Sequence, residues 1–284
     1  MRTSTIKRGP INLAVRRFGT RGPHIVMVHG LASSQHIWDL VVPRLEKRFR
    51  VTTIDQRGHG ESSKPASGYD FRSMSADLNK VMASLGAGKV VLVGHSFGAN
   101  VSLETAVRYP KRVAGVMCVD GGMGSMSEVM TWPEAREMLA PPRFGGMPLK
   151  SYLAMVKSHF PRGVWSPDVE AIVRTIVRVD GHDRVYPRLS RTNHLRILKA
   201  MYDQRPKEVF ARVRAPVLIF AARPRPSDDS ERDFYEMKKR SIDQIRAASP
   251  RVKVEWITSM HDIPLDKPKE LATRIARFVR AVMR

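Results

Sequence analysis

The chain has 284 residues, 42% of them hydrophobic, and its 49 Lys and Arg against 27 Asp and Glu give a formal net charge of +22. This length suffices for one large domain, or for a domain with an insertion, whose core needs no disulfide or metal. No run of about 18 apolar residues occurs, which excludes a membrane-spanning helix, and no apolar stretch of signal length follows the basic first residues. We therefore expect a cytoplasmic protein.

The charge and the cysteine count narrow the possible partners. Basic residues are scattered along the whole chain, with no basic tail and no patch interleaved with aromatic residues. This distribution favours a solvated basic surface over a specific nucleic-acid site, and binding to a polyanion stays open as an alternative. The single cysteine, Cys118, lies in the apolar run 116–119, which excludes an intramolecular disulfide and fits a reducing compartment.

Short apolar runs and amphipathic stretches alternate along most of the chain. Two strands come first, a third ends at His29-Gly30, and from there strands and helices take turns. This alternation predicts an α/β fold with a mostly parallel eight-stranded sheet and helices on both faces. The expected strands are 4–7, 12–18, 25–28, 51–54, 90–93, 113–119, 217–221 and 252–257, and the expected helices are 35–47, 74–85, 99–108, 230–247 and 269–282.

The alternation stops after Gly121-Gly122. Residues 123–205 show no buried-strand pattern but contain proline-punctuated helices, such as the one begun by Ser166-Pro167 with apolar residues up to 177 on one face. Asp180-Gly181 predicts a tight hairpin between residues 178–179 and 184–185. We therefore expect a core domain in two parts, 1–122 and 206–284, with a mainly helical cap, 123–205, inserted after the sixth strand.

The composition of the expected cap favours an apolar binding site. Seven of the fifteen methionines and two of the four tryptophans lie in it. Flexible thioethers and aromatic rings suit an adaptable apolar pocket, although a small cap also needs a core of its own. The sequence therefore predicts a lid over the site, with the individual contacts unassigned. The residues concerned are Met123, Met126, Met130, Met138, Met147, Met155, Met201, Trp132 and Trp165.

A serine bracketed by glycines follows the expected strand 90–93. The pentapeptide GHSFG at 94–98 places Ser96 between that apolar run and an apolar helical stretch. A nucleophile elbow has this context, because a serine on a sharp strand-to-helix turn has a strained backbone and needs neighbours without bulk. Gly94 and Gly98 supply them. The pattern therefore predicts Ser96 as an accessible nucleophile.

A serine nucleophile needs a base to take its proton and a carboxylate to hold that base in the right tautomer. Of the nine histidines, His261 follows the last expected strand, where a loop can reach over the elbow. His95 lies inside the elbow and is expected to point away from the serine proton, in a supporting position. The other histidines outside the motifs carry no such positional argument.

The ordered motifs resemble those of the α/β-hydrolase superfamily over essentially the whole chain. Besides the elbow, His29-Gly30 follows the third strand and the octapeptide DQRGHGES at 55–62 follows the fourth. We interpret residues 57–60 as structural, holding the end of the sheet. No H-E-x-x-H or C-x-x-C motif occurs, so no metal and no organic cofactor is expected.

The resemblance also implies roles for individual residues. In this family the chain order is nucleophile, acid, histidine. It therefore implies Ser96 as the nucleophile and His261 as the general base, with an acid between them at the end of a strand. The backbone N–H groups of Leu31 and Phe97 are implied as the oxyanion hole.

The acid is where the sequence departs from the commoner family pattern. Strand 217–221 leads into ARPRPSDD at 222–229 without an early Gly-x-Asp, and helix capping explains Asp228 and Asp229 well. Asp120 ends the strand after the elbow helix, before a flexible glycine pair, and some members of the superfamily place their acid there. We prefer Asp120 over Asp228 and leave both open.

These residues predict a carboxylesterase-like serine hydrolase that cleaves esters by two-step acyl transfer through an acyl-enzyme. The expected partner is a small ester with an apolar acyl or aryl group, and the oligomeric state stays unassigned. A lactonase, a C–C hydrolase, a perhydrolase or a ligand-binding receptor on the same scaffold stays open. Epoxide hydrolases and haloalkane dehalogenases are disfavoured, because the resembling enzymes need an aspartate where Ser96 stands.

Overall fold

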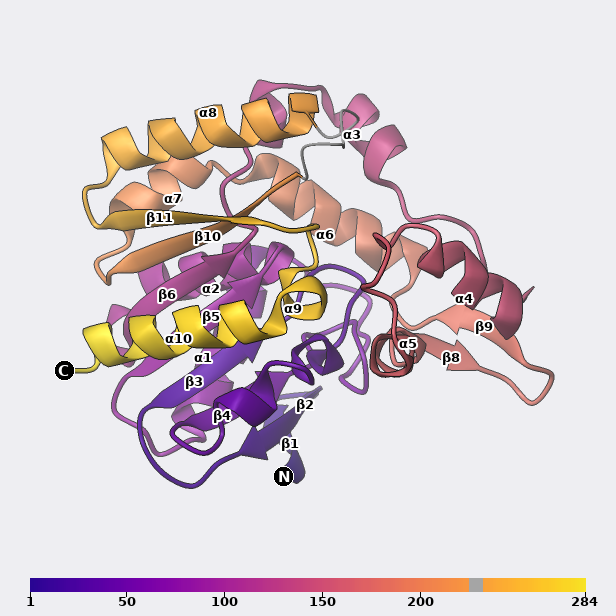
Figure 1. Ribbon diagram of the computed structural model, residues 1–284, viewed down its shortest axis with the longest axis horizontal. Helices are drawn as coiled ribbons and strands as arrows, with labels where there is room; N and C mark the ends of the chain where they lie inside the picture. Colours follow the sequence, from indigo (N-terminus) through magenta and orange to yellow (C-terminus); the bar gives the residue numbers. More distant parts are fainter. Residues whose placement is uncertain (225–231) are drawn as a thin grey trace.

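The computed structural model describes residues 1–224 and 232–284, which form an α/β fold around one eight-stranded sheet (Figure 1). The strand order is β1-β2-β4-β3-β5-β6-β10-β11. Pairings from β4 to β11 are parallel, and β2 pairs antiparallel with β1 and with β4. The predicted fold class is therefore confirmed. The strands are β1 (Arg2–Arg8), β2 (Ile11–Phe18), β3 (His24–Val28), β4 (Arg50–Ile54), β5 (Val90–His95), β6 (Val113–Val119), β10 (Val217–Arg223) and β11 (Val252–Thr258).

Helices cover both faces of the sheet because the central strands are apolar on both sides. Val26 and Val28 pack into one buried cluster, while Ile25 and Met27, which alternate with them, pack into another. On the first face lie α1 (Phe71–Ala83), α2 (Phe97–Arg108), α7 (Pro206–Arg212) and α8 (Arg232–Ala248), and on the second lies α10 (Pro268–Val282). The short helix α9 (Ile263–Asp266) joins β11 to α10.

The helix expected over residues 35–47 is wrong. Two 3-10 helices, η1 (Gln35–Trp38) and η2 (Val42–Arg44), occupy this stretch. Pro43 has no N–H to donate to the preceding turn, and its ring clashes with the carbonyl four residues earlier, so one regular α-helix cannot run through it. The apolar spacing that suggested a helix still serves packing, because Trp38, Val42 and Leu45 are all buried.

Between β6 and β10 the chain leaves the sheet. The hairpin expected around Asp180 is confirmed, because β8 and β9 pair antiparallel. The three short strands form a small sheet of order β7-β9-β8, in which Val177 and Val185 are buried and most other residues are exposed, so no strand here is buried along its length, as expected. The helix begun by Ser166 also ends at Arg174, earlier than its apolar face suggested. The elements are η4 (Met126–Glu128), α3 (Trp132–Leu139), β7 (Met147–Pro148), α4 (Leu149–Lys157), α5 (Pro167–Arg174), β8 (Val177–Val179), β9 (Arg184–Pro187) and α6 (Arg191–Asp203).

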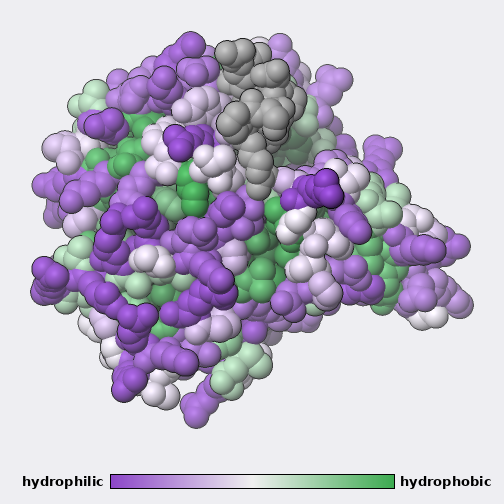
Figure 2. All heavy atoms as spheres, viewed as in Figure 1, coloured by the Kyte–Doolittle hydropathy of each residue, from purple (hydrophilic) through white to green (hydrophobic). Residues whose placement is uncertain are grey.

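Four of these elements, α4, α5, β8 and β9, project as a lobe to one side of the core (Figure 1). In the same view of the surface, hydrophilic residues predominate, and many of the apolar ones that show lie near the centre, toward this lobe (Figure 2). Within the described residues, no helix is both long and apolar enough to cross a membrane.

Candidate active site

Ser96 lies on a tight turn between β5 and α2. Its backbone has φ 53° and ψ −126°, a conformation that non-glycine residues rarely adopt. A side chain on Gly98 would collide with the carbonyl oxygens of Val28 and His29, and one on Gly94 would collide with the backbone of Gly98. Both glycines are therefore required by close backbone approach, as a nucleophile elbow demands.

The turn is fixed from the neighbouring strand. The Ser96 N–H donates to the carbonyl of Val119 at 2.9 Å. Gly121 lies so close to Ser96 that a Cβ at this position would collide with its backbone. The end of β6 and the glycines that follow it therefore clamp the elbow in its strained conformation.

Asp120 follows β6 and reaches His261 across the top of the sheet. Its carboxylate is 1% exposed, and Oδ2 accepts a 2.7 Å hydrogen bond from Nδ1 of His261, whose side chain is 51% exposed. Asp120 itself has φ 41°, so the backbone is turned sharply at the end of the strand. The structure thus brings together two residues that lie 141 positions apart in the sequence. Asp228 and Asp229 lie outside the described residues.

Hydrogen bonding decides which nitrogen of His261 carries a proton. A buried carboxylate can only accept, so Nδ1 is the protonated nitrogen and Nε2 is left as the acceptor. Partial burial lowers the pKa of His261, but the hydrogen bond and the charge of Asp120 outweigh it, and the pKa lies above its usual value. For Asp120, burial has the opposite effect and raises the pKa. The hydrogen bond to His261 and the charges of His261 and Lys238 outweigh it and lower the pKa of Asp120 to about 2.

His95 contacts the backbone of the loop that carries His261. Its ring is buried, its Nε2 donates to the carbonyl of His261 at 3.1 Å, and the two ring centroids are 5.0 Å apart. Burial, followed by the positive charge that His261 can carry, lowers the pKa of His95. His95 therefore stays neutral and holds the backbone of the loop that carries His261.

Lys238 was missed by sequence reasoning. It lies on α8, and its ammonium donates to both oxygens of Asp120 and to the carbonyl of Ala222. In the sequence it belongs to the run Lys238-Lys239-Arg240, which resembles an ordinary solvated helix face. No pattern in the sequence singles out the one member of this run that turns inward.

The two amides expected to hold an oxyanion lie near Ser96. Phe97 is the first residue of α2, so its N–H belongs to the first turn, where N–H groups have no partner within the helix. Leu31 follows Gly30, where an added Cβ would stand 3.1 Å from the Cβ of Ser96. The β3–η1 loop and the start of α2 thus flank the serine from two sides.

Two buried histidines shape this loop. His59 Nε2 accepts from the N–H of Ala32, which has φ 56°, and His29 Nε2 accepts from the N–H of Gln56, each at 3.1 Å. Burial is the main reason that the pKa of His29 falls to about 4 and that of His59 to about 3, so both rings are neutral. The contacts agree with the structural interpretation of residues 57–60.

A cavity of about 230 Å³ opens beside Ser96, Asp120 and His261. Its apolar lining includes the exposed rim residues Val129 and Met138. Of the cap methionines expected to line such a pocket, five do so and are joined by one from α8, whereas Met147 and Met155 pack elsewhere. The lining methionines are Met123, Met126, Met130, Met138, Met201 and Met237.

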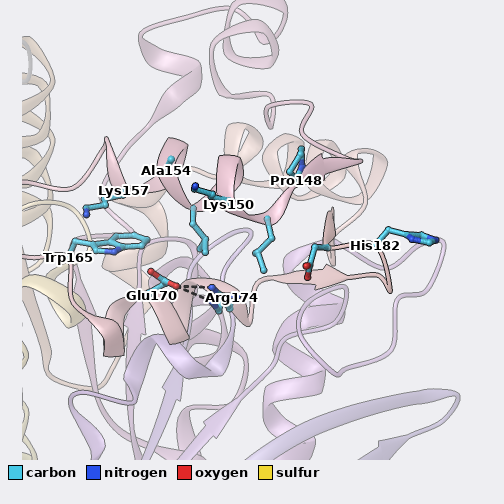
Figure 3. Close-up of a pocket in the computed structure, with 11 residues that line it drawn as sticks. Pro148, Lys150, Ala154, Lys157, Trp165, Glu170, Arg174 and His182 are labelled. Carbon is cyan, nitrogen blue, oxygen red and sulfur yellow. Dashed lines mark hydrogen bonds and ion pairs between the residues drawn. The ribbon is translucent and has the colours of Figure 1, made fainter.

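A larger cavity, of about 510 Å³, lies in the projecting lobe (Figure 3). Lys157 and Trp165 line it, and an ion pair joins Glu170 to Arg174 on its wall. His182 is its one histidine among the described residues, and no expected catalytic residue borders it. The candidate site is therefore the smaller cavity, which contains the serine, the carboxylate and the imidazole.

Comparison with known proteins agrees with the fold. The family model described as the alpha/beta hydrolase fold matches residues 23–149. The solved structure of E-2-(acetamidomethylene)succinate hydrolase is similar over 98% of both chains, with a TM-score of 0.79 and 21% identity. The chain has the α/β-hydrolase fold. A second structure of this α/β-hydrolase fold, the enol-lactonase from Burkholderia xenovorans, has a TM-score of 0.72 over 98% of this chain and 100% of that one, at 17% identity.

Curated relatives match only part of this chain. The 2-(acetamidomethylene)succinate hydrolase of Mesorhizobium japonicum is 37% identical over 128 residues, which is 45% of this chain and 46% of the relative. A fluoroacetate dehalogenase from Burkholderia sp. is 34% identical over 107 residues, or 36% and 35% of the two chains. A soluble epoxide hydrolase from Corynebacterium sp. is 38% identical over 85 residues, or 30% of each. These matches span less than half of each relative, whose names describe different reactions.

Proposed function

We propose that the protein is a serine hydrolase that cleaves carboxylic esters through an acyl-enzyme, with Ser96 as nucleophile, His261 as base and Asp120 as acid. The observation that carries the proposal is the 2.7 Å bond between His261 Nδ1 and the buried Asp120 carboxylate, beside a cavity that Ser96 also lines. A carboxylate in this position holds the imidazole in the tautomer that a base needs and stabilises the imidazolium.

In the first step, the Ser96 oxygen attacks the ester carbonyl while Nε2 of His261 takes the hydroxyl proton. The resulting oxyanion accepts hydrogen bonds from the amides of Leu31 and Phe97. Collapse of the tetrahedral intermediate breaks the bond to the alcohol oxygen, which receives the proton from His261. Water then enters, gives a proton to the same nitrogen and attacks the acyl-enzyme, and as the bond to the Ser96 oxygen breaks, His261 returns that proton to the serine and the acid is released.

The substrate class follows from the lining of the cavity. Thioethers adapt to different apolar shapes, and the exposed rim residues extend the apolar surface outward. We assign the pocket to an ester with an apolar acyl or aryl group. In this assignment residues 123–205 act as the cap over a core made of residues 1–122 and 206–284. The net charge of +22 serves a solvated surface without a specific nucleic-acid partner.

Ser96 separates this proposal from two activities that curated relatives carry. The resembling epoxide hydrolases and dehalogenases need a carboxylate nucleophile, which a serine cannot replace. The relative named 2-(acetamidomethylene)succinate hydrolase gives no reason to prefer its own substrate here, because the cavity beside Ser96 is predominantly apolar. A lactonase would use the same residues and is distinguished by the substrate panel below.

Two assays on the intact protein test the proposal together. A serine-directed fluorophosphonate probe should label the wild type but not the variant Ser96→Ala, and a panel of acyl and aryl esters and lactones should show turnover, with the apolar acyclic esters preferred. Labelling with no turnover of any ester or lactone would favour a ligand-binding receptor. Absence of labelling would contradict an activated serine.

A further inference from the structure

Lys238 makes an ion pair with the proposed catalytic acid. Its Nζ donates to Asp120 Oδ1 at 2.8 Å, to Asp120 Oδ2 at 3.1 Å and to the carbonyl oxygen of Ala222 at 2.9 Å. The Lys238 side chain is only 10% exposed, and the carboxylate it meets is 1% exposed. An ion pair this shielded from water interacts far more strongly than one on the surface.

The geometry separates Lys238 from a substrate-binding role. An ammonium has three N–H donors, and these three contacts lead to the acid and to the strand beside it. Although Lys238 borders the cavity next to Ser96, its charged end contacts Asp120. These contacts indicate that Lys238 acts on catalysis through Asp120.

Asp120 needs such support because it reaches sideways from its own strand. The other neighbour of Oδ1 is the N–H of Ala222 near the end of β10, at 2.9 Å. Lys238 bridges the carboxylate and the carbonyl of the same Ala222. The ammonium therefore ties the acid of β6 to the end of β10 and leaves Oδ2 aligned with Nδ1 of His261.

We propose that Lys238 is a positioning residue that fixes the Asp120 carboxylate toward His261 and offsets part of its negative charge, so that His261 is a neutral base at a lower pH than it would be beside the carboxylates alone. The proposal rests on the proposed function for its catalytic meaning, whereas its electrostatic part concerns the folded protein alone.

The groups that face His261 show why an offset is needed. Asp120 approaches from β6, Asp262 lies next to the ring along the chain, and His95 packs against it from β5. The two carboxylates favour the protonated imidazolium, which cannot accept a proton from serine. His95 is buried and neutral and adds no compensating charge. Among the residues that the structure describes, Lys238 on α8 is a cation that opposes the two carboxylates, and its charge lowers the pKa of His261.

The test is an NMR titration of the His261 ring, assigned with His261→Gln, in the wild type and in Lys238→Met. Removing the ammonium should raise the His261 titration midpoint by about one pH unit. Lys238→Arg keeps the charge and should bring the midpoint back near the wild-type value. Lys239→Met, which removes a half-exposed lysine from the next position, should leave it unchanged.

The pH dependence of kcat/KM provides a second test. The ratio of wild-type to Lys238→Met kcat/KM should be about tenfold larger at a pH below both midpoints than at a pH above them, because one pH unit corresponds to a tenfold change in the neutral fraction. If Lys238→Met does not fold, Lys238→Gln replaces it with the same expectation. An unchanged His261 midpoint in a folded, uncharged variant would overturn the proposal.

The failures of the two proposals are distinguishable. A shifted midpoint in a protein without esterase activity would sink the proposed function and leave the electrostatic role of Lys238 in place. Normal esterase activity of the wild type, with an unchanged His261 midpoint in Lys238→Met, would leave the proposed function in place and overturn the role of Lys238.

Discussion

The Asp120 carboxylate, which belongs to the end of β6, accepts a 2.9 Å hydrogen bond from the N–H of Ala222 near the end of β10. The two strands are neighbours in the sheet, with Val119 opposite Phe220. A side chain on the turn after β6 therefore stands at the end of the next strand. In the proposed site, this lateral reach lets Asp120 serve a histidine that follows β11.

Replacing Asp120 by Asn tests this assignment of the acid. An amide in place of the carboxylate removes the charge that stabilises the imidazolium and favours the wrong histidine tautomer, so kcat should fall by about 10³- to 10⁴-fold. Asp183→Asn, on the exposed hairpin, is the matched control and should leave kcat unchanged. A loss confined to Asp228→Asn, with Asp120→Asn as active as the wild type, would refute the assignment.

The pH dependence of ester hydrolysis follows from His261. The base must be neutral in the free enzyme, and the pKa of His261 lies above its usual value of 6.5. We expect kcat/KM to rise with pH and to level off only above a midpoint higher than about 6.5. Measuring kcat/KM for a neutral ester over a series of pH values gives this midpoint. A plateau already reached at pH 5 would mean that another group, or none, limits the reaction.

The apolar cavity predicts a dependence on acyl chain length. Met130 is half-buried and lines the cavity, so Met130→Trp should obstruct long acyl groups. We expect at least a tenfold loss of kcat/KM for p-nitrophenyl octanoate and less than a threefold change for the acetate. Met155→Trp, equally half-buried but packed elsewhere, should change neither value. An equal loss for both esters in Met130→Trp would argue against this binding mode.

Arg57 provides a prediction about stability. Its guanidinium forms two hydrogen bonds with Asp77, at 2.6 and 2.8 Å, and both side chains are at most 5% exposed. Arg57→Met leaves the carboxylate buried and should lower the free energy of unfolding by about 3 kcal/mol, with kcat of the folded protein within about threefold. Arg174→Met removes an exposed pair and should cost under about 1 kcal/mol. Urea unfolding compares the two, and a stable but inactive Arg57→Met would assign a catalytic role to this loop.

Local sequence patterns were enough to predict much of the fold. They also predicted that Ser96 and His261 each follow a strand. The elbow at Ser96 and the loop at His261 each follow a strand that is readable from a short apolar run. The helix over 35–47 failed because Pro43 breaks an apolar spacing that otherwise suits a helix. A single backbone restriction therefore outweighed the periodicity.

Contacts between distant segments could not be predicted in the same way. The choice between Asp120 and Asp228 as the acid stayed open because it depends on which strands end side by side. No local sequence pattern indicates the order of strands in a sheet. Lys238 meets Asp120 across 118 positions, and only the packing of α8 decides which lysine of its run turns inward. The residues that tune the expected base were therefore the hardest to find.

The role of Ser96 as nucleophile is tested most directly by kcat/KM for p-nitrophenyl esters in Ser96→Ala. Ser125→Ala is the control, because Ser125 lines the same cavity. We predict a loss of at least about 10⁴-fold for Ser96→Ala and less than a threefold change for Ser125→Ala. Equal rates for Ser96→Ala and the wild type would contradict a nucleophilic role for Ser96.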